Sequence, residues 1–133
     1  MKNILTSSLL FLSLLIITSC EGPYTFENSG STINLSTYDP FEIELEGNAS
    51  TGYTWQIVSY DSTVIKQVGE KEYKANDDRT GSAGTYTYKF QTIGDGQTTL
   101  VLVYKRKWEE HTLHDKTFEM KVVVGTMGRI LEE

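Results

Sequence analysis

Apolar residues recur at every second position along most of the chain from Thr32 onward, which is the period of a β-strand with one buried face. The alternation is present at residues 33–35, 41–45, 53–57, 86–90, 100–104 and 118–124. Residues 64–74 are ambiguous and are predicted to hold one or two short strands. No segment carries an apolar stripe of helical period over three turns.

Turn-forming residues separate these runs, as in Asp39-Pro40 and Gly94-Asp95-Gly96. Seven or eight short strands with regular turn signals are typical of an antiparallel sandwich. We therefore expect an all-β chain with an immunoglobulin-like antiparallel β-sandwich over residues 32–133.

The N-terminal stretch does not follow the strand pattern. Residues 1–19 contain Lys2, a short apolar run and two small residues before Cys20, which predicts a secretory signal peptide, because the run is too short for a transmembrane helix. Residues 17–20 resemble a bacterial lipobox, which implies lipidation of Cys20 and a membrane-anchored location in a bacterial cell envelope. A plain signal peptide followed by an incidental cysteine remains the alternative. Residues 20–31 are expected to be the lipidated cysteine and a tether.

Length and charge limit the remaining possibilities. The chain has 133 residues, enough for one modest domain, and we expect a monomer. Its single cysteine excludes an intrachain disulfide bond. A formal net charge of −6 disfavours nucleic acid as a partner.

The chain shows no pattern typical of an enzyme. His111 and His114 lie three residues apart among acidic residues, but a polar loop of this kind is more often a solvated turn than a metal site. No cysteine–histidine pair is available for nucleophilic catalysis within the domain. The glycine-containing segment 81–84 lacks the lysine that a phosphate-binding loop requires. We expect no catalytic residues, metal or cofactor.

Three loop segments are not explained by ordinary sandwich design: residues 48–53, 79–84 and 105–110. The first is small and rich in hydroxyl groups, ends in Tyr53 and is followed by Trp55. The third contains Trp108 where the strand pattern changes to a charged loop. This tryptophan either closes the end of the core or is an exposed anchor for a partner, and exposed aromatic residues near arginine are favoured in binding hot spots.

In order along the chain, these segments resemble the motifs Asn-x-Thr-Thr-Gly-Tyr/Phe, Gly-x-Gly-Gly and Arg-Pro-Trp of the chagasin-like inhibitors of papain-family cysteine proteases. The matching residues are Asn48, Ala49, Ser50, Thr51, Gly52 and Tyr53 in the first motif, Gly81, Ser82, Ala83 and Gly84 in the second, and Arg106, Lys107 and Trp108 in the third. Ser50, Ala83 and Lys107 depart from the family pattern, and Ala83 would be strained if its position needed a positive φ.

The resemblance implies a reversible protein inhibitor that presents three loops at one end of a sandwich. Its partner would be a papain-family cysteine protease. In that family the first loop enters the active-site cleft, which would place Thr51 nearest the catalytic cysteine, and the other two loops hold the sides of the cleft. The alternative is a lipid-anchored adhesion or envelope-assembly module, which predicts aromatic side chains exposed on a sheet face.

Overall fold

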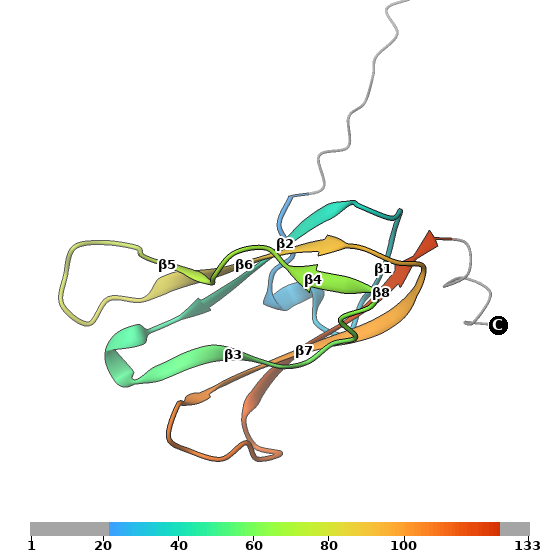
Figure 1. Ribbon diagram of the computed structural model, residues 1–133. Helices are drawn as coiled ribbons and strands as arrows, with labels where there is room; N and C mark the ends of the chain where they lie inside the picture. The colour runs from blue at the N-terminus through green and yellow to red at the C-terminus, as the bar shows by residue number, and fades with distance from the viewer. Residues whose placement is uncertain (1–21, 126–133) are drawn as a thin grey trace, which may run out of the picture.

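The computed structural model describes residues 22–125, which form a sandwich of two β-sheets (Figure 1). One sheet has the strand order β1 (Thr32–Leu35), β8 (Lys116–Val124), β7 (Gly96–Arg106) and β3 (Tyr53–Ser59). The other has the order β2 (Pro40–Gly47), β6 (Gly84–Thr92) and β4 (Ile65–Gln67), and β5 (Glu72–Ala75) also pairs with β6. Two short 3₁₀ turns, η1 (Phe26–Asn28) and η2 (Ala49–Thr51), complete the described elements. The predicted all-β immunoglobulin-like sandwich of seven to eight strands is confirmed.

The core forms where the alternating apolar side chains of the two sheets face each other. In β6, for example, Tyr86, Tyr88 and Phe90 are buried, and Lys89 between them is exposed. Trp55 of β3 is fully buried in the same core. Burying each large apolar side chain contributes about 1.5–3 kcal/mol, so the period-two pattern specifies both the strands and the face that each one buries.

Two features of the strand pairing were not predicted from the sequence. β1 runs parallel to β8, so the prediction of a wholly antiparallel sandwich is wrong at this pair. The reason is that the chain crosses to the other sheet after Leu35, and β1 therefore lies beside the last strand instead of forming a hairpin with β2. The ambiguous residues 64–74 contain two strands, β4 and β5, which pair with successive halves of β6.

The segment expected to be a tether lies against the sandwich from Tyr24 onward. The Tyr24 N–H donates to the Glu42 carbonyl at 2.9 Å, and the Glu44 N–H donates to the Tyr24 carbonyl at 2.8 Å. The Phe26 ring lies 6.1 Å from the Trp55 ring, centroid to centroid. The segment takes this place because its backbone satisfies groups on the β2 edge that would otherwise be unpaired.

The predicted signal peptide and Cys20 lie outside the described residues. Within residues 22–125, no helix is long and apolar enough to cross a membrane. The predictions of lipidation and of membrane anchoring therefore rest on the sequence.

Candidate functional site

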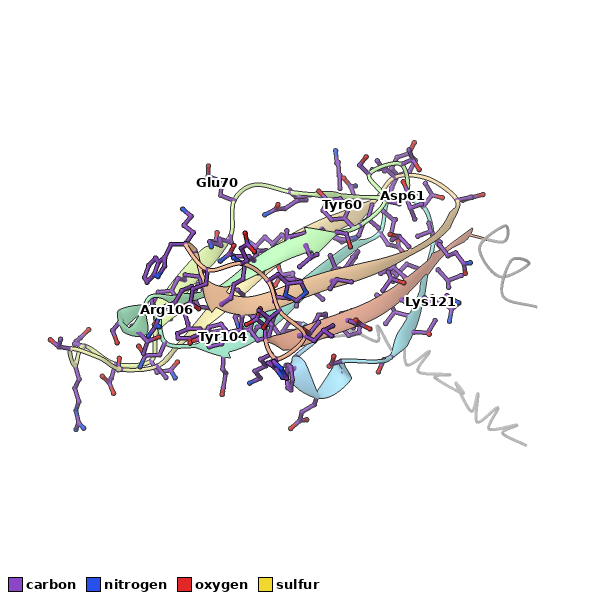
Figure 2. The ribbon with its side chains drawn as sticks, turned by 90° about the horizontal axis from the view of Figure 1, so that it is seen from below. Tyr60, Asp61, Glu70, Tyr104, Arg106 and Lys121 are labelled. Carbon is purple, nitrogen blue, oxygen red and sulfur yellow. The ribbon has the colours of Figure 1, made fainter. Side chains whose placement is uncertain are left out.

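Three loops lie together at one end of the sandwich, which we call the tip (Figure 1). They are the β2–β3 loop (residues 48–52), the β5–β6 loop (residues 76–83) and the β7–β8 loop (residues 107–115). Figure 2 shows Tyr104 and Arg106 toward this end, with Asp61 and Lys121 toward the opposite one. The three segments singled out in the sequence therefore share one end of the domain.

Asn48 fixes the shape of the β2–β3 loop. Its side-chain Oδ1 accepts hydrogen bonds from the backbone N–H of Ser50 at 3.1 Å and from the Ser50 hydroxyl at 2.6 Å, as an N-cap of the 3₁₀ turn does. The Thr51 hydroxyl donates to the Asn48 carbonyl at 2.7 Å. Gly52 ends the turn with φ +81°, a conformation that other residues rarely adopt. The loop is therefore a closed turn with a defined shape.

Asn48 also joins this loop to the β5–β6 loop, because its Nδ2 donates to the Gly81 carbonyl at 2.9 Å. Gly81 has φ +84°, which explains the need for glycine there. Ala83 does not have a positive φ, so the strain considered for this substitution is absent. Gly84 is buried at the start of β6, where an added Cβ would lie 2.5 Å from the Lys74 carbonyl oxygen. Gly84 therefore permits close packing and is not part of the exposed tip.

Trp108 is exposed, with 74% of its surface accessible, which decides between the two roles considered for it. Its indole ring lies over Gly52, where an added Cβ would be 2.9 Å from Cη2. Arg106 is oriented by three neighbours. Its guanidinium lies 4.7 Å from the centroid of the Tyr53 ring, its Nη1 is 3.3 Å from Glu109 Oε1, and its Nε donates to the Thr51 carbonyl at 3.5 Å. The third segment thus packs against the first and presents a large apolar surface to solvent.

An aromatic cluster supports the tip from below. The Tyr104 hydroxyl accepts a hydrogen bond from the Asn48 N–H at 2.7 Å, and the Tyr104 ring packs against Tyr53 and Trp55 at 5.4 and 5.3 Å. The Trp55 indole N–H donates to the Glu46 carbonyl at 2.9 Å. These contacts hold both ends of the β2–β3 loop on rigid strands. Tyr53 and Trp55 therefore form the base of the tip, and Thr51 and Trp108 lie on its exposed face.

Burial raises the pKa of Tyr86 to about 12, with smaller contributions from the neighbouring phenols of Tyr104 and Tyr73. The Tyr86 hydroxyl donates to the Tyr53 carbonyl at 3.3 Å, which ties β6 of one sheet to β3 of the other beneath the tip. The pKa of Lys71 is lowered, first by partial burial and then by the nearby charge of Lys107.

The two histidines do not gather a set of metal ligands. His111 Nδ1 lies 3.1 Å from Asp115 Oδ2, and that carboxylate also accepts the Thr112 N–H at 2.7 Å. The hydrogen bond from Thr112 is the main cause that lowers the pKa of Asp115. Among residues 22–125, no three histidine, cysteine, aspartate or glutamate side chains are grouped as metal ligands would be.

The burial of the strand tyrosines favours the inhibitor interpretation over the adhesion alternative. That alternative predicts aromatic side chains exposed on a sheet face, but Tyr86 and Tyr88 are each only 2% exposed. Tyr104 is partly buried against the core. The exposed tryptophan is instead at the tip.

Comparison with known proteins agrees with the geometry of the tip. A family model described as "Chagasin family peptidase inhibitor I42" matches residues 34–122. The chain belongs to the chagasin family of peptidase inhibitors. Amoebiasin-1 of Entamoeba histolytica is 32% identical to it over 102 residues, which cover 75% of this chain and 96% of that protein.

Solved structures of inhibitors share the fold. The cysteine protease inhibitor EhICP2 from Entamoeba histolytica has a TM-score of 0.66 and 25% identity, covering 78% of this chain and 95% of the other. The solution structure of amebosin has a TM-score of 0.64 and 34% identity, covering 78% of this chain and all of that one. PbICP-C, solved in complex with falcipain-2, has a TM-score of 0.55 at 20% identity and covers 78% and 92%. The chain is thus a member of an inhibitor family and not an enzyme.

Within this family member, two supporting residues were missed in the sequence. The alternation over residues 100–104 places Tyr104 on the buried face of its strand, but its hydroxyl also holds the Asn48 backbone. Lys71 lies in an irregular segment far from the motifs in sequence, and its Nζ is 3.4 Å from the Trp55 carbonyl oxygen beneath the tip. Nothing in the local pattern around Lys71 indicates this position, since it depends on the contact between the two sheets.

Proposed function

We propose that the chain acts as a reversible inhibitor of papain-like cysteine proteases and that the tip binds in the active-site cleft. The observation that carries this proposal is the packing of exposed Trp108 over Gly52, beside the closed turn that contains Thr51. The β2–β3 loop would enter the cleft, with Thr51 nearest the catalytic cysteine. The β5–β6 and β7–β8 loops would contact the two sides of the cleft.

The chemistry of the β2–β3 loop suits such a site. A papain-type centre holds a thiolate–imidazolium pair, so it presents both a hydrogen-bond acceptor and a donor. The hydroxyl hydrogens of Ser50 and Thr51 are used within the loop, and their oxygens keep lone pairs that can accept from an imidazolium. The side chains at the apex are small, so the turn fits a narrow groove.

The loop conformation also opposes cleavage. Residues Ala49–Thr51 form a 3₁₀ turn, in which the Thr51 N–H donates to the Asn48 carbonyl and the Gly52 N–H donates to the Ala49 carbonyl. A protease that cleaves extended peptides would have to break these bonds before a peptide carbonyl reached the thiolate. The same bonds reduce the entropy lost on binding, because the loop is already ordered.

Membrane attachment is a further part of the proposal and rests on the sequence. The lipobox-like residues 17–20 support lipidation of Cys20 and anchoring in a bacterial cell envelope.

A tip of three loops is compatible with an interface of about 800 Å² per partner, the usual size for protease–inhibitor complexes. We propose that the protein acts as a monomer.

The test is a titration of the purified protein against papain and several cathepsins. We expect inhibition that reaches completion at a one-to-one ratio with the tightest target and that reverses on dilution. An absence of inhibition at micromolar concentration against every enzyme would refute the proposal. Metabolic labelling of the expressed protein with a fatty acid, compared with Cys20→Ser, tests the lipidation separately.

A further inference from the structure

Residues 24–31, which we call the strap, connect the two sheets outside the three loops of the tip. The strap is drawn in blue in Figure 1. At its start, Tyr24 makes two backbone hydrogen bonds with β2, and near its end the Gly30 N–H donates to the Glu119 carbonyl of β8 at 2.7 Å. The strap is therefore attached to both sheets. It precedes residues 34–122, which the family model matches, so the family motifs do not describe it.

Phe26 of the strap covers the buried side chain of Trp55. The two ring centroids are 6.1 Å apart, and 39% of the Phe26 surface is accessible. Lys116, at the start of β8, adds to this cover, because its Nζ lies 4.3 Å from the centroid of the Phe26 ring and 6.0 Å from that of the Trp55 ring. Trp55 itself has no accessible surface. Phe26 and Lys116 thus form an outer layer over this indole.

The 3₁₀ turn η1 holds the backbone of Phe26 in a defined place. The Thr25 N–H donates to Asn28 Oδ1 at 2.9 Å, and the Asn28 N–H donates to the Thr25 carbonyl at 2.9 Å. These two hydrogen bonds close the turn around Phe26. Because the backbone is already ordered, keeping the ring on the indole costs less conformational entropy than it would on a free segment.

Trp55 transmits this order to the β2–β3 loop. Its indole N–H donates to the Glu46 carbonyl at 2.9 Å, just before the loop, and its own backbone lies in β3, just after the loop. One side chain therefore ties together the strands on both sides of the loop. Trp55 also packs on Tyr104, whose hydroxyl accepts a hydrogen bond from the Asn48 N–H. A shift of the indole would disturb both groups that hold the loop.

We propose that Phe26 is a positioning residue for inhibition, which holds Trp55 in place and thereby fixes the shape of the β2–β3 loop. This inference rests on the proposed function, because it assumes that this loop enters the protease cleft. Without the Phe26 ring, water reaches the indole and competes for its hydrogen bond to Glu46. The loop then loses more conformational freedom when it binds, and the complex is weaker.

The experiment measures the inhibition constant and the free energy of unfolding of Phe26→Ala, Phe26→Leu and the control Tyr24→Ala. The enzyme is the one among papain and several cathepsins that the unaltered protein inhibits best. Tyr24 is the other aromatic residue of the strap, and its ring packs against Phe41 at the start of β2, with centroids 6.5 Å apart. Tyr24→Ala thus removes an aromatic side chain from the same segment and leaves the cover of Trp55 in place.

Hydrogen exchange of the Trp55 indole N–H reports on the indole in the absence of any protease. The chain has two tryptophans, so the Trp55 signal in the NMR spectrum is the indole signal that remains in Trp108→Ala. Exchange requires this N–H to leave the Glu46 carbonyl and meet water, so its rate measures how often the indole opens. A general loss of stability would act on this rate equally in Phe26→Ala and in a control of the same stability.

We expect Phe26→Ala to weaken inhibition by about tenfold and Phe26→Leu, which keeps an apolar cover, by about threefold or less. Exchange at Trp55 should be faster in Phe26→Ala than in Tyr24→Ala, and Tyr24→Ala should keep the inhibition constant within about twofold. Equal inhibition constants for Phe26→Ala and Tyr24→Ala, or an unchanged exchange rate in Phe26→Ala, would overturn the positioning role and leave the inhibitor function intact. If the unaltered protein inhibits none of the enzymes, the proposed function fails and the role of Phe26 in inhibition fails with it.

Discussion

Replacing Trp108 by alanine removes a large exposed aromatic side chain from the tip. A tryptophan buries about 150–250 Å² when it is fully covered, and 74% of this one is accessible in the free protein. A complex that covers it would therefore bury about 150 Å² more. At about 25 cal/mol per Å², this burial contributes roughly 3.7 kcal/mol.

Ordering the side chain on binding costs about 0.5–1.5 kcal/mol, so the net loss on substitution is about 2–3 kcal/mol. This corresponds to a rise of roughly 30- to 150-fold in the inhibition constant. The free energy of unfolding should change by less than about 0.5 kcal/mol, because the side chain contributes little to the core.

The assay is an inhibition titration of Trp108→Ala against the enzyme that the unaltered protein binds best, together with urea unfolding of both proteins. Tyr38→Ala is the matched control. Tyr38 is 69% exposed and lies between β1 and β2, at the end of the sandwich away from the tip, so its loss should leave inhibition unchanged. An inhibition constant within threefold of the original value for a folded Trp108→Ala would refute the role given to this side chain.

Three further outcomes follow from the tip geometry. Gly52→Ala should lower the free energy of unfolding by about 1–2 kcal/mol and weaken inhibition, because the φ of Gly52 is +81° and the new Cβ meets Trp108. The control is Gly30→Ala, where φ is +88° and the surrounding space is open; it should cost similar stability without affecting inhibition. Asn48→Ala should lower the free energy of unfolding by about 1 kcal/mol, because it removes the cap of the 3₁₀ turn. Asn48→Asp keeps the cap and loses only the hydrogen bond to the β5–β6 loop. Inhibition assays should show weaker inhibition by both variants. Because burial favours the neutral phenol of Tyr86, the contribution of this residue to stability should be constant up to the ordinary pKa of 10.0 and fall as the pH rises toward about 12. A denaturant series that shows no such fall between these pH values would contradict this assignment.

The strands could be predicted where one face of the strand is buried and the other is exposed to solvent. The alternation in β2, β6 and β8 is visible in the sequence because each of these strands faces the opposite sheet. β5 has no such pattern, since all four of its residues are exposed. Its pairing with β6 is supported by the packing of Tyr73 on Tyr86, with ring centroids 4.7 Å apart, which no alternation predicts. The attachment of Tyr24 to β2 was missed for the same reason.

The candidate site could be predicted as a set of motifs but not as a surface. The glycine of the first motif, Gly52, has a φ of +81° that other residues rarely adopt, so its residue type fits its place in the turn. The exposure of Trp108 was open in the sequence, because the end of a strand can turn a side chain toward either the core or solvent. The position of Lys71 beneath the tip depends on two sheets meeting, and no local pattern indicates such a contact.

If the tip binds as proposed, it covers the catalytic cysteine of a papain-like protease. The most direct measurement is the rate at which iodoacetamide alkylates the catalytic thiol of papain, or of a cathepsin that the protein inhibits better, with and without the protein. We expect alkylation to slow in proportion to the fraction of enzyme bound and to recover on dilution. Inhibition of substrate cleavage with an unchanged alkylation rate would contradict it, because the tip would then bind outside the catalytic centre.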